Sequence, residues 1–117
     1  MKKNFLLLLA IGMLFSCEAI FVENISNATV TILAPTEGST VTNGTVNFNW
    51  NAVEDAETYQ IQIATPTFAN ASQIVLDSTI SKTSFSKNLT VGIYQWRVNA
   101  SNSDYQTTYT TTSFEVQ

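Results

Sequence analysis

Residue types that enzymes commonly use are scarce in this sequence. Its 117 residues include no histidine and a single cysteine. Without histidine, the chain lacks the usual general base and the commonest protein ligand for metals. One cysteine cannot form a disulfide within the chain, and no serine lies in a nucleophile-elbow motif. The sequence therefore argues against catalysis, and we expect no metal and no cofactor.

Basic residues are few as well, which limits the classes of partner. Lys2 and Lys3 precede the first apolar run, so the rest of the chain keeps Lys82, Lys87 and Arg97 against nine acidic residues, a net charge of −6. A surface with this charge repels phosphate groups, and no basic stripe reverses the effect. We expect no nucleic acid partner.

The one apolar run near the start is too short to be a permanent membrane span. It extends from Phe5 to Phe15 and follows a short basic segment. A helix needs about 20 apolar residues to cross a bilayer, whereas a signal-peptide core needs about 7–15. Residues 1–16 are therefore predicted to form a cleavable leader.

The leader ends in Leu-Phe-Ser-Cys at residues 14–17, which resembles the lipobox of bacterial lipoproteins. The resemblance implies that Cys17 is diacylated on sulfur, becomes the new N-terminus and anchors the protein in a lipid bilayer. Glu18 replaces the aspartate associated with inner-membrane retention, so the analogy favours the outer membrane and leaves open which side the protein faces. The alternative is that Cys17 is an ordinary residue beside a standard cleavage site or within an uncleaved anchor.

From Thr29 onward, apolar and polar residues alternate with the two-residue period of half-buried strands. Residues 17–28 have no clean period and are predicted to be a tether. No window after the leader has helical periodicity. The pattern predicts seven strands in an antiparallel β-sandwich, at about residues 29–33, 46–50, 59–63, 74–76, 81–86, 94–100 and 105–116.

The order of the aromatic motifs resembles a fibronectin type III-like (immunoglobulin-like) domain over residues 29–117. The matching features are a tryptophan in Val46–Trp50 on the second strand, a tyrosine in Tyr59–Ile63 on the third, and the bend Leu89–Tyr94 before the sixth. The most similar versions are those of exported proteins in Bacteroidetes-type bacteria. The resemblance implies that Tyr94 bonds backbone near Leu89 as a tyrosine corner. The predicted core comprises Phe48, Trp50, Tyr59, Leu89, Tyr94 and Trp96.

A polar face on adjacent outer strands is the candidate binding surface. Amides, one guanidinium and one aromatic ring on such a face could recognise a protein edge or sugar hydroxyls. The alternative is an ordinary solvated sheet face, which is also our interpretation of the outward amides of Asn47, Asn49 and Asn51. The predicted face comprises Gln60, Gln62, Gln95, Arg97, Asn99, Tyr109 and Thr111.

Two further motifs are weaker. Glu54, Asp55 and Glu57 lie close together, but they do not follow a calcium-loop spacing, so we interpret them as a solvated acidic turn. Ser78, in Asp-Ser-Thr, resembles the short O-glycosylation signal of Bacteroidetes-type bacteria and is a possible glycan attachment site.

These features predict a lipid-anchored, non-catalytic interaction module in the cell envelope whose partner is an envelope protein. The alternative function is that of a glycan-binding accessory lipoprotein in a polysaccharide-uptake system.

Overall fold

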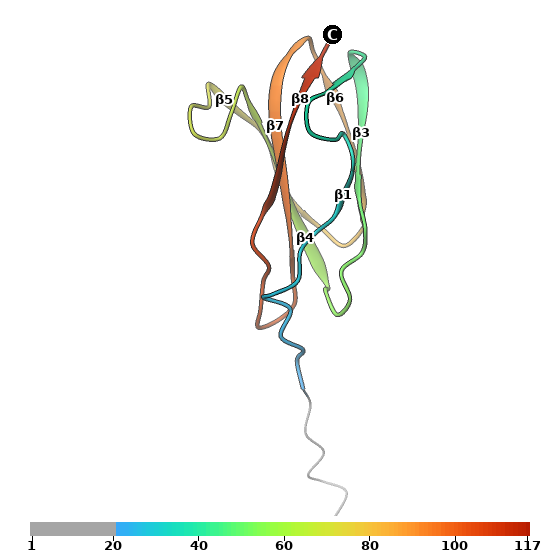
Figure 1. Cartoon of the computed structure of the whole chain (residues 1–117), viewed down its shortest axis with the longest axis vertical. Helices are drawn as coiled ribbons and strands as arrows, with labels where there is room; N and C mark the ends of the chain where they lie inside the picture. The colour runs from blue at the N-terminus through green and yellow to red at the C-terminus, as the bar shows by residue number, and fades with distance from the viewer. Residues whose placement is uncertain (1–20) are drawn as a thin grey trace, which may run out of the picture.

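The computed structural model describes residues 21–117, which form two β-sheets packed face to face (Figure 1). Within these residues, no helix is long and apolar enough to cross a membrane. Cys17 and the predicted leader lie outside the described residues. The fold class is confirmed: the domain is an all-β sandwich.

Sheet A has three strands in the order β1-β3-β6, and sheet B has five in the order β2-β8-β7-β4-β5. All neighbouring strands are antiparallel except β2 and β8, which run parallel. The strands are β1 (Ile32–Ala34), β2 (Ser39–Val41), β3 (Gly44–Trp50), β4 (Thr58–Thr65), β5 (Gln73–Ile80), β6 (Ser84–Leu89), β7 (Gly92–Ser101) and β8 (Thr110–Val116).

The structure has eight strands rather than the predicted seven because the first strand region is divided between the sheets: the strand predicted at 29–33 corresponds to β1, whereas β2 was not predicted. Pro35 follows β1 and has no N–H group to continue a ladder. Beyond it the chain crosses to sheet B, where the backbone N–H of Gly38 donates to the carbonyl of Ser113 (2.8 Å). β2 then runs parallel to β8, so the sandwich is not wholly antiparallel.

The last strand begins later than its threonine-rich sequence indicates. Residues 102–109 form a loop that folds back on the preceding strand, and only a single bridge joins Ser101 to Gln106. The N–H of Thr107 donates to the carbonyl of Ala100 (2.9 Å), and its side chain is buried. Regular pairing with β7 therefore starts only at Thr110.

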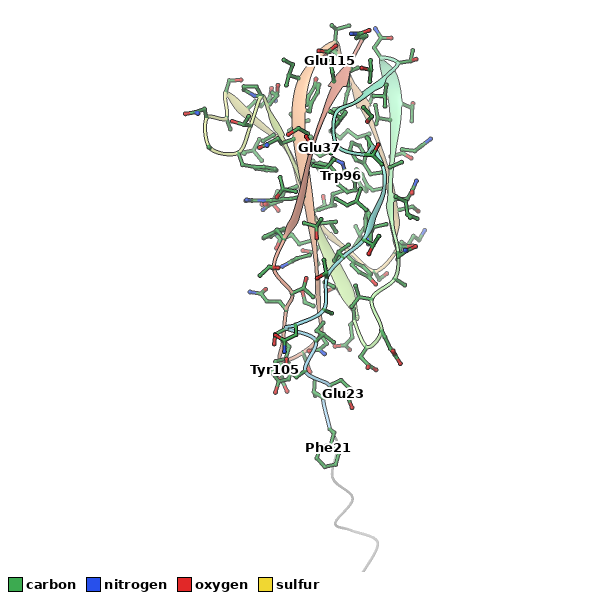
Figure 2. All side chains as sticks on the ribbon, viewed as in Figure 1. Phe21, Glu23, Glu37, Trp96, Tyr105 and Glu115 are labelled. Atoms are coloured by element: carbon green, nitrogen blue, oxygen red, sulfur yellow. The ribbon has the colours of Figure 1, made fainter. Side chains whose placement is uncertain are left out.

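Aromatic side chains fill the space between the sheets. Trp96, labelled in Figure 2, is fully buried, with ring centroids 5.0 Å from Phe48 and 6.0 Å from Trp50. Trp50 meets Tyr59 edge to face at 5.6 Å. All six predicted core residues, including Leu89 and Tyr94, belong to this buried cluster.

Polar atoms of the core aromatics fix the connections between strands. The Tyr94 hydroxyl donates to the carbonyl of Thr90 (2.8 Å), directly after Leu89, as a tyrosine corner would. The Trp96 indole N–H donates to the carbonyl of Pro35 (3.1 Å), at the point where the first strand divides. The core and the chain crossover are thus joined by one buried hydrogen bond.

The packed domain starts before the predicted boundary at Thr29. Ile25 is only 5% exposed and belongs to the core cluster, and the Asn102 amide donates to the carbonyl of Glu23 (2.8 Å). The end of the predicted tether is therefore part of the sandwich. In Figure 1 the N-terminal segment leaves at one end of the sandwich and Gln117 lies at the other.

The two buried tryptophans predict different responses to the same substitution. The Trp96 N–H has Pro35 as acceptor, whereas the Trp50 N–H has none within residues 21–117. Trp96→Phe leaves a buried carbonyl unsatisfied, which costs about 1–3 kcal/mol beyond the cavity that both substitutions create. In urea unfolding, we expect Trp96→Phe to lower the free energy of unfolding by about 1–2 kcal/mol more than Trp50→Phe. Equal losses would contradict the assigned hydrogen bond.

Candidate functional site

Strand pairing brings most of the predicted binding residues together on the outer face of sheet B. Arg97 on β7 lies directly opposite Gln62 on β4 and opposite Thr111 on β8. Gln95, two residues before Arg97, shares its face because side chains alternate along a strand. The sequence-based face is therefore a continuous surface over three strands.

Asn99 is a correction to that face, because it is only 3% exposed. The 102–109 loop covers it: the Asn99 amide donates to the carbonyl of Thr107 (3.4 Å), and the Thr107 hydroxyl accepts from the N–H of Ala100 (3.0 Å). The alternation places Asn99 on the outer face but gives no sign that a loop would fold over it. Asn99 is not available to a partner.

Arg97 is at the centre of the remaining surface. Its guanidinium carbon lies 4.1 Å from the ring centroid of Phe68 and 4.6 Å from that of Tyr109. Its Nε donates to the Gln62 side-chain carbonyl (2.7 Å). Two cation–π contacts and a hydrogen bond hold this side chain in one position.

Sequence reasoning missed Phe68, which belongs to the loop between β4 and β5. The backbone N–H of Phe68 donates to the Gln95 side-chain carbonyl (2.9 Å), and the Gln95 amide donates to the Ser113 hydroxyl (3.0 Å). These bonds fold the loop onto the sheet and bring the ring over Arg97. A lone aromatic residue between Pro66 and a run of small residues was the available signal, but it carries no periodicity that fixes a face.

Asp77 on β5 completes the surface. It accepts hydrogen bonds from the amides of Gln60 (2.8 Å) and Gln62 (3.2 Å), and these bonds, followed by the charge of Arg97, lower the pKa of Asp77. Burial raises the pKa of Tyr109. At neutral pH the surface therefore holds one anion, one cation and a neutral phenol. We name it the Arg97 face: Gln60, Gln62, Phe68, Asp77, Gln95, Arg97, Tyr109 and Thr111.

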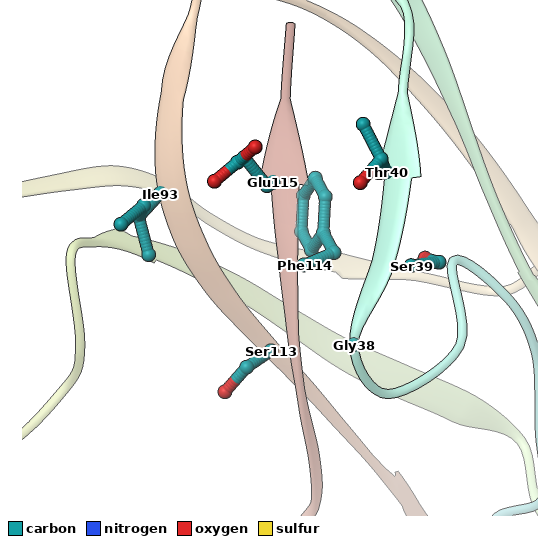
Figure 3. Close-up of a pocket in the computed structure, with 7 residues that line it drawn as sticks. All are labelled: Gly38, Ser39, Thr40, Ile93, Ser113, Phe114 and Glu115. Carbon is teal, nitrogen blue, oxygen red and sulfur yellow. The ribbon is translucent and has the colours of Figure 1, made fainter.

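A shallow cavity of about 260 Å³ adjoins this face where β2 meets β8 (Figure 3). Ile93 and Glu115 are among its lining residues (Figure 3), and Ser113 links it to the Arg97 face through Gln95. It is lined by Gly38, Ser39, Thr40, Ile93, Ser113, Phe114 and Glu115. Its lining offers hydroxyls, one aliphatic side chain, one aromatic ring and one carboxylate.

The other sequence motifs lie away from this face. Ser78 pairs with the buried Ile61 and is half-buried on the inner side of β5, so its glycosylation stays a prediction. In residues 21–117, no three histidine, cysteine or acidic side chains are grouped to hold a metal ion. Asn47 on β3 accepts from the Ser86 hydroxyl (2.7 Å) across sheet A.

Comparison with known proteins identifies the fold. No protein-family model matches the chain, and no curated protein matches it in sequence. Among solved structures, fibronectin(III)-like modules of Clostridium thermocellum CbhA align with a TM-score of 0.55 and 13% identity, covering 76% of this chain and 96% of that chain.

Two further solved structures agree with this assignment. A fibronectin type III domain from human KIAA0970 protein aligns with a TM-score of 0.60 and 12% identity, covering 86% of this chain and 85% of that one. The crystal structure of FN3tt aligns with a TM-score of 0.55 and 18% identity, covering 76% of this chain and 97% of that chain. At these identities the similarity concerns the fold alone, which is fibronectin type III-like.

Proposed function

We propose that this protein is a lipid-anchored, non-catalytic interaction module of the cell envelope that binds a partner protein through the Arg97 face. The observation that carries the proposal is the position of Arg97, packed against both Phe68 and Tyr109 on the outside of sheet B. Arginine and aromatic residues dominate the energetics of many protein interfaces. Because these side chains are already ordered, binding them costs little conformational entropy.

The opposite sheet offers a useful contrast. The outward side chains of β3 are Thr45, Asn47 and Asn49, which are small and polar. Thr45 and Asn47 already bond across to β6, through Asn88 and Ser86. The outward side of β3 presents no aromatic ring and no cation. We therefore assign the contact to sheet B.

Lipid attachment at Cys17 holds the proposed module at a membrane surface. Each buried methylene of an acyl chain contributes about 0.8 kcal/mol, so two or three chains anchor a protein stably. Ile25, which is buried in the core, lies eight residues after Cys17. At no more than about 3.6 Å per residue, this link keeps that end of the sandwich within roughly 30 Å of the bilayer. The proposed partner is thus membrane-associated, and Glu18 favours the outer membrane.

A glycan-binding function is the second candidate, since the face combines amides with the Tyr109 ring. However, the amide hydrogens of Gln60 and Gln62 are directed to Asp77, and Gln95 bonds to Phe68 and Ser113. Side chains engaged in this way have less capacity left for sugar hydroxyls. The hydrogen-bond network therefore favours a protein partner.

The lipid anchor predicts a specific result for Cys17→Ser. The wild-type chain expressed in a bacterium that processes lipoproteins should partition into detergent and carry the mass of attached acyl chains on Cys17. The serine variant cannot form the thioether and should carry no added acyl mass at residue 17. Intact-mass spectrometry that finds an uncleaved leader without fatty acid in the wild type would contradict the anchor.

The interaction face is tested by photo-crosslinking in cells. A photoreactive residue at the exposed position Thr111 should yield a discrete crosslinked protein, and the matched control at Asn47, exposed on sheet A, should not. Adding Arg97→Gln should reduce the yield at Thr111 about tenfold.

Two outcomes would refute this assignment. Equal crosslinking from Thr111 and Asn47 would show that the Arg97 face is not selective. Saturable binding of purified protein to a neutral oligosaccharide on a glycan array, lost in Arg97→Gln, would replace the protein partner with a sugar.

A further inference from the structure

The Arg97 guanidinium already makes three contacts, two with aromatic rings and one with a side-chain carbonyl. Its guanidinium carbon lies 4.1 Å from the ring centroid of Phe68, whose N–H is bonded to Gln95, and 4.6 Å from that of Tyr109, which directly precedes β8. Two aromatic rings therefore pack against the guanidinium. The Nε side faces Gln62.

The hydrogen-bond donors of Arg97 that remain are its two Nη nitrogens. Within residues 21–117, these nitrogens have no acceptor, and Arg97 forms no salt bridge. They are also absent from the buried polar atoms that lack a partner, so they are in contact with solvent. Asp77 does not neutralise Arg97 directly, because Gln62 stands between them.

We propose that the Nη nitrogens of Arg97 receive a single carboxylate, the side chain of an aspartate or glutamate on the partner protein. This inference rests on the proposed function and names the chemistry recognised at that face. Because two rings pack against the guanidinium and Nε is engaged by Gln62, a further acceptor can bond only at the Nη nitrogens. A carboxylate fits because its two oxygens match the spacing of the two Nη donors.

The surroundings favour a side-chain carboxylate over other anions. A net charge of −6 after the leader repels polyanions, so the ligand is one isolated acid rather than an acidic run. The Phe68 and Tyr109 rings lie close to the guanidinium and limit the space around it. An acid on a methylene stem occupies little of that space, whereas the carboxylate of a uronic acid is attached directly to a bulky sugar ring.

Arg97 is the sole arginine of the sequence, which makes the test direct. In the full chain, labelled with ¹⁵N and held in detergent micelles, its Nε–H gives one side-chain signal. Titration with N-acetylglutamate amide should shift this signal saturably, with a dissociation constant in the millimolar range. The neutral isostere N-acetylglutamine amide should not shift it. Methyl glucuronide, which carries the acid on a sugar, should bind at least about threefold more weakly.

Two variants distinguish recognition of the carboxylate by the planar guanidinium from simple attraction to a positive charge. Arg97→Lys keeps the charge but loses the planar fork, so the backbone signals of Gln62 and Gln95 should show binding weakened about tenfold or more. Asn47→Ala on sheet A should leave the titration unchanged.

Equal responses to the glutamate and glutamine compounds would overturn the inference. Undiminished binding by Arg97→Lys, or tighter binding of the glucuronide, would do the same. Crosslinking at Thr111 in cells would still report the proposed function separately, because it does not depend on how Arg97 bonds to its ligand.

Discussion

The packing of Trp96 against Phe48 and Trp50 is the contact on which the rest of the structure depends. It joins the two sheets through ring contacts of 5.0 and 6.0 Å and, through its N–H, holds the carbonyl of Pro35 where the first strand divides. A domain of this size buries a small core, so each large aromatic residue supplies a substantial share of its apolar area. Removing the indole would therefore affect both sheets and the crossover between them.

The same strand supplies both the core and the proposed contact face. Along β7, Tyr94, Trp96 and Val98 point inward, and the two-residue period turns Gln95 and Arg97 outward. Arg97 thus belongs to a strand whose alternate residues are buried in the core. Phe68 and Tyr109 then fix its side chain, so the cation is rigid without being fully buried. Pre-ordering of this kind makes the Arg97 face suited to binding.

Period-two alternation made much of this fold predictable from the sequence, including the inward Trp50 and Trp96 and the outward Gln62 and Arg97. What alternation could not predict is where loops fold. The alternation along β7 assigns Asn99 to the outer face, yet the loop that contains Thr107 covers its side chain. The ring of Phe68 reaches Arg97 through a loop that has no period. The parallel pairing of β2 depends on a crossover, which three residues of local sequence do not encode.

Oxidative footprinting of aromatic side chains in native membranes tests the central claim most directly. Hydroxyl radicals label Phe68 and Tyr109 on the Arg97 face and, as an internal reference, the half-buried Phe85 of sheet A. If the Arg97 face is the contact surface, Phe68 and Tyr109 should be oxidised more slowly in membranes than in purified protein, while Phe85 reacts equally in both. Equal oxidation rates for Phe68 and Tyr109 in membranes and in purified protein, with Phe85 as the reference, would contradict the account.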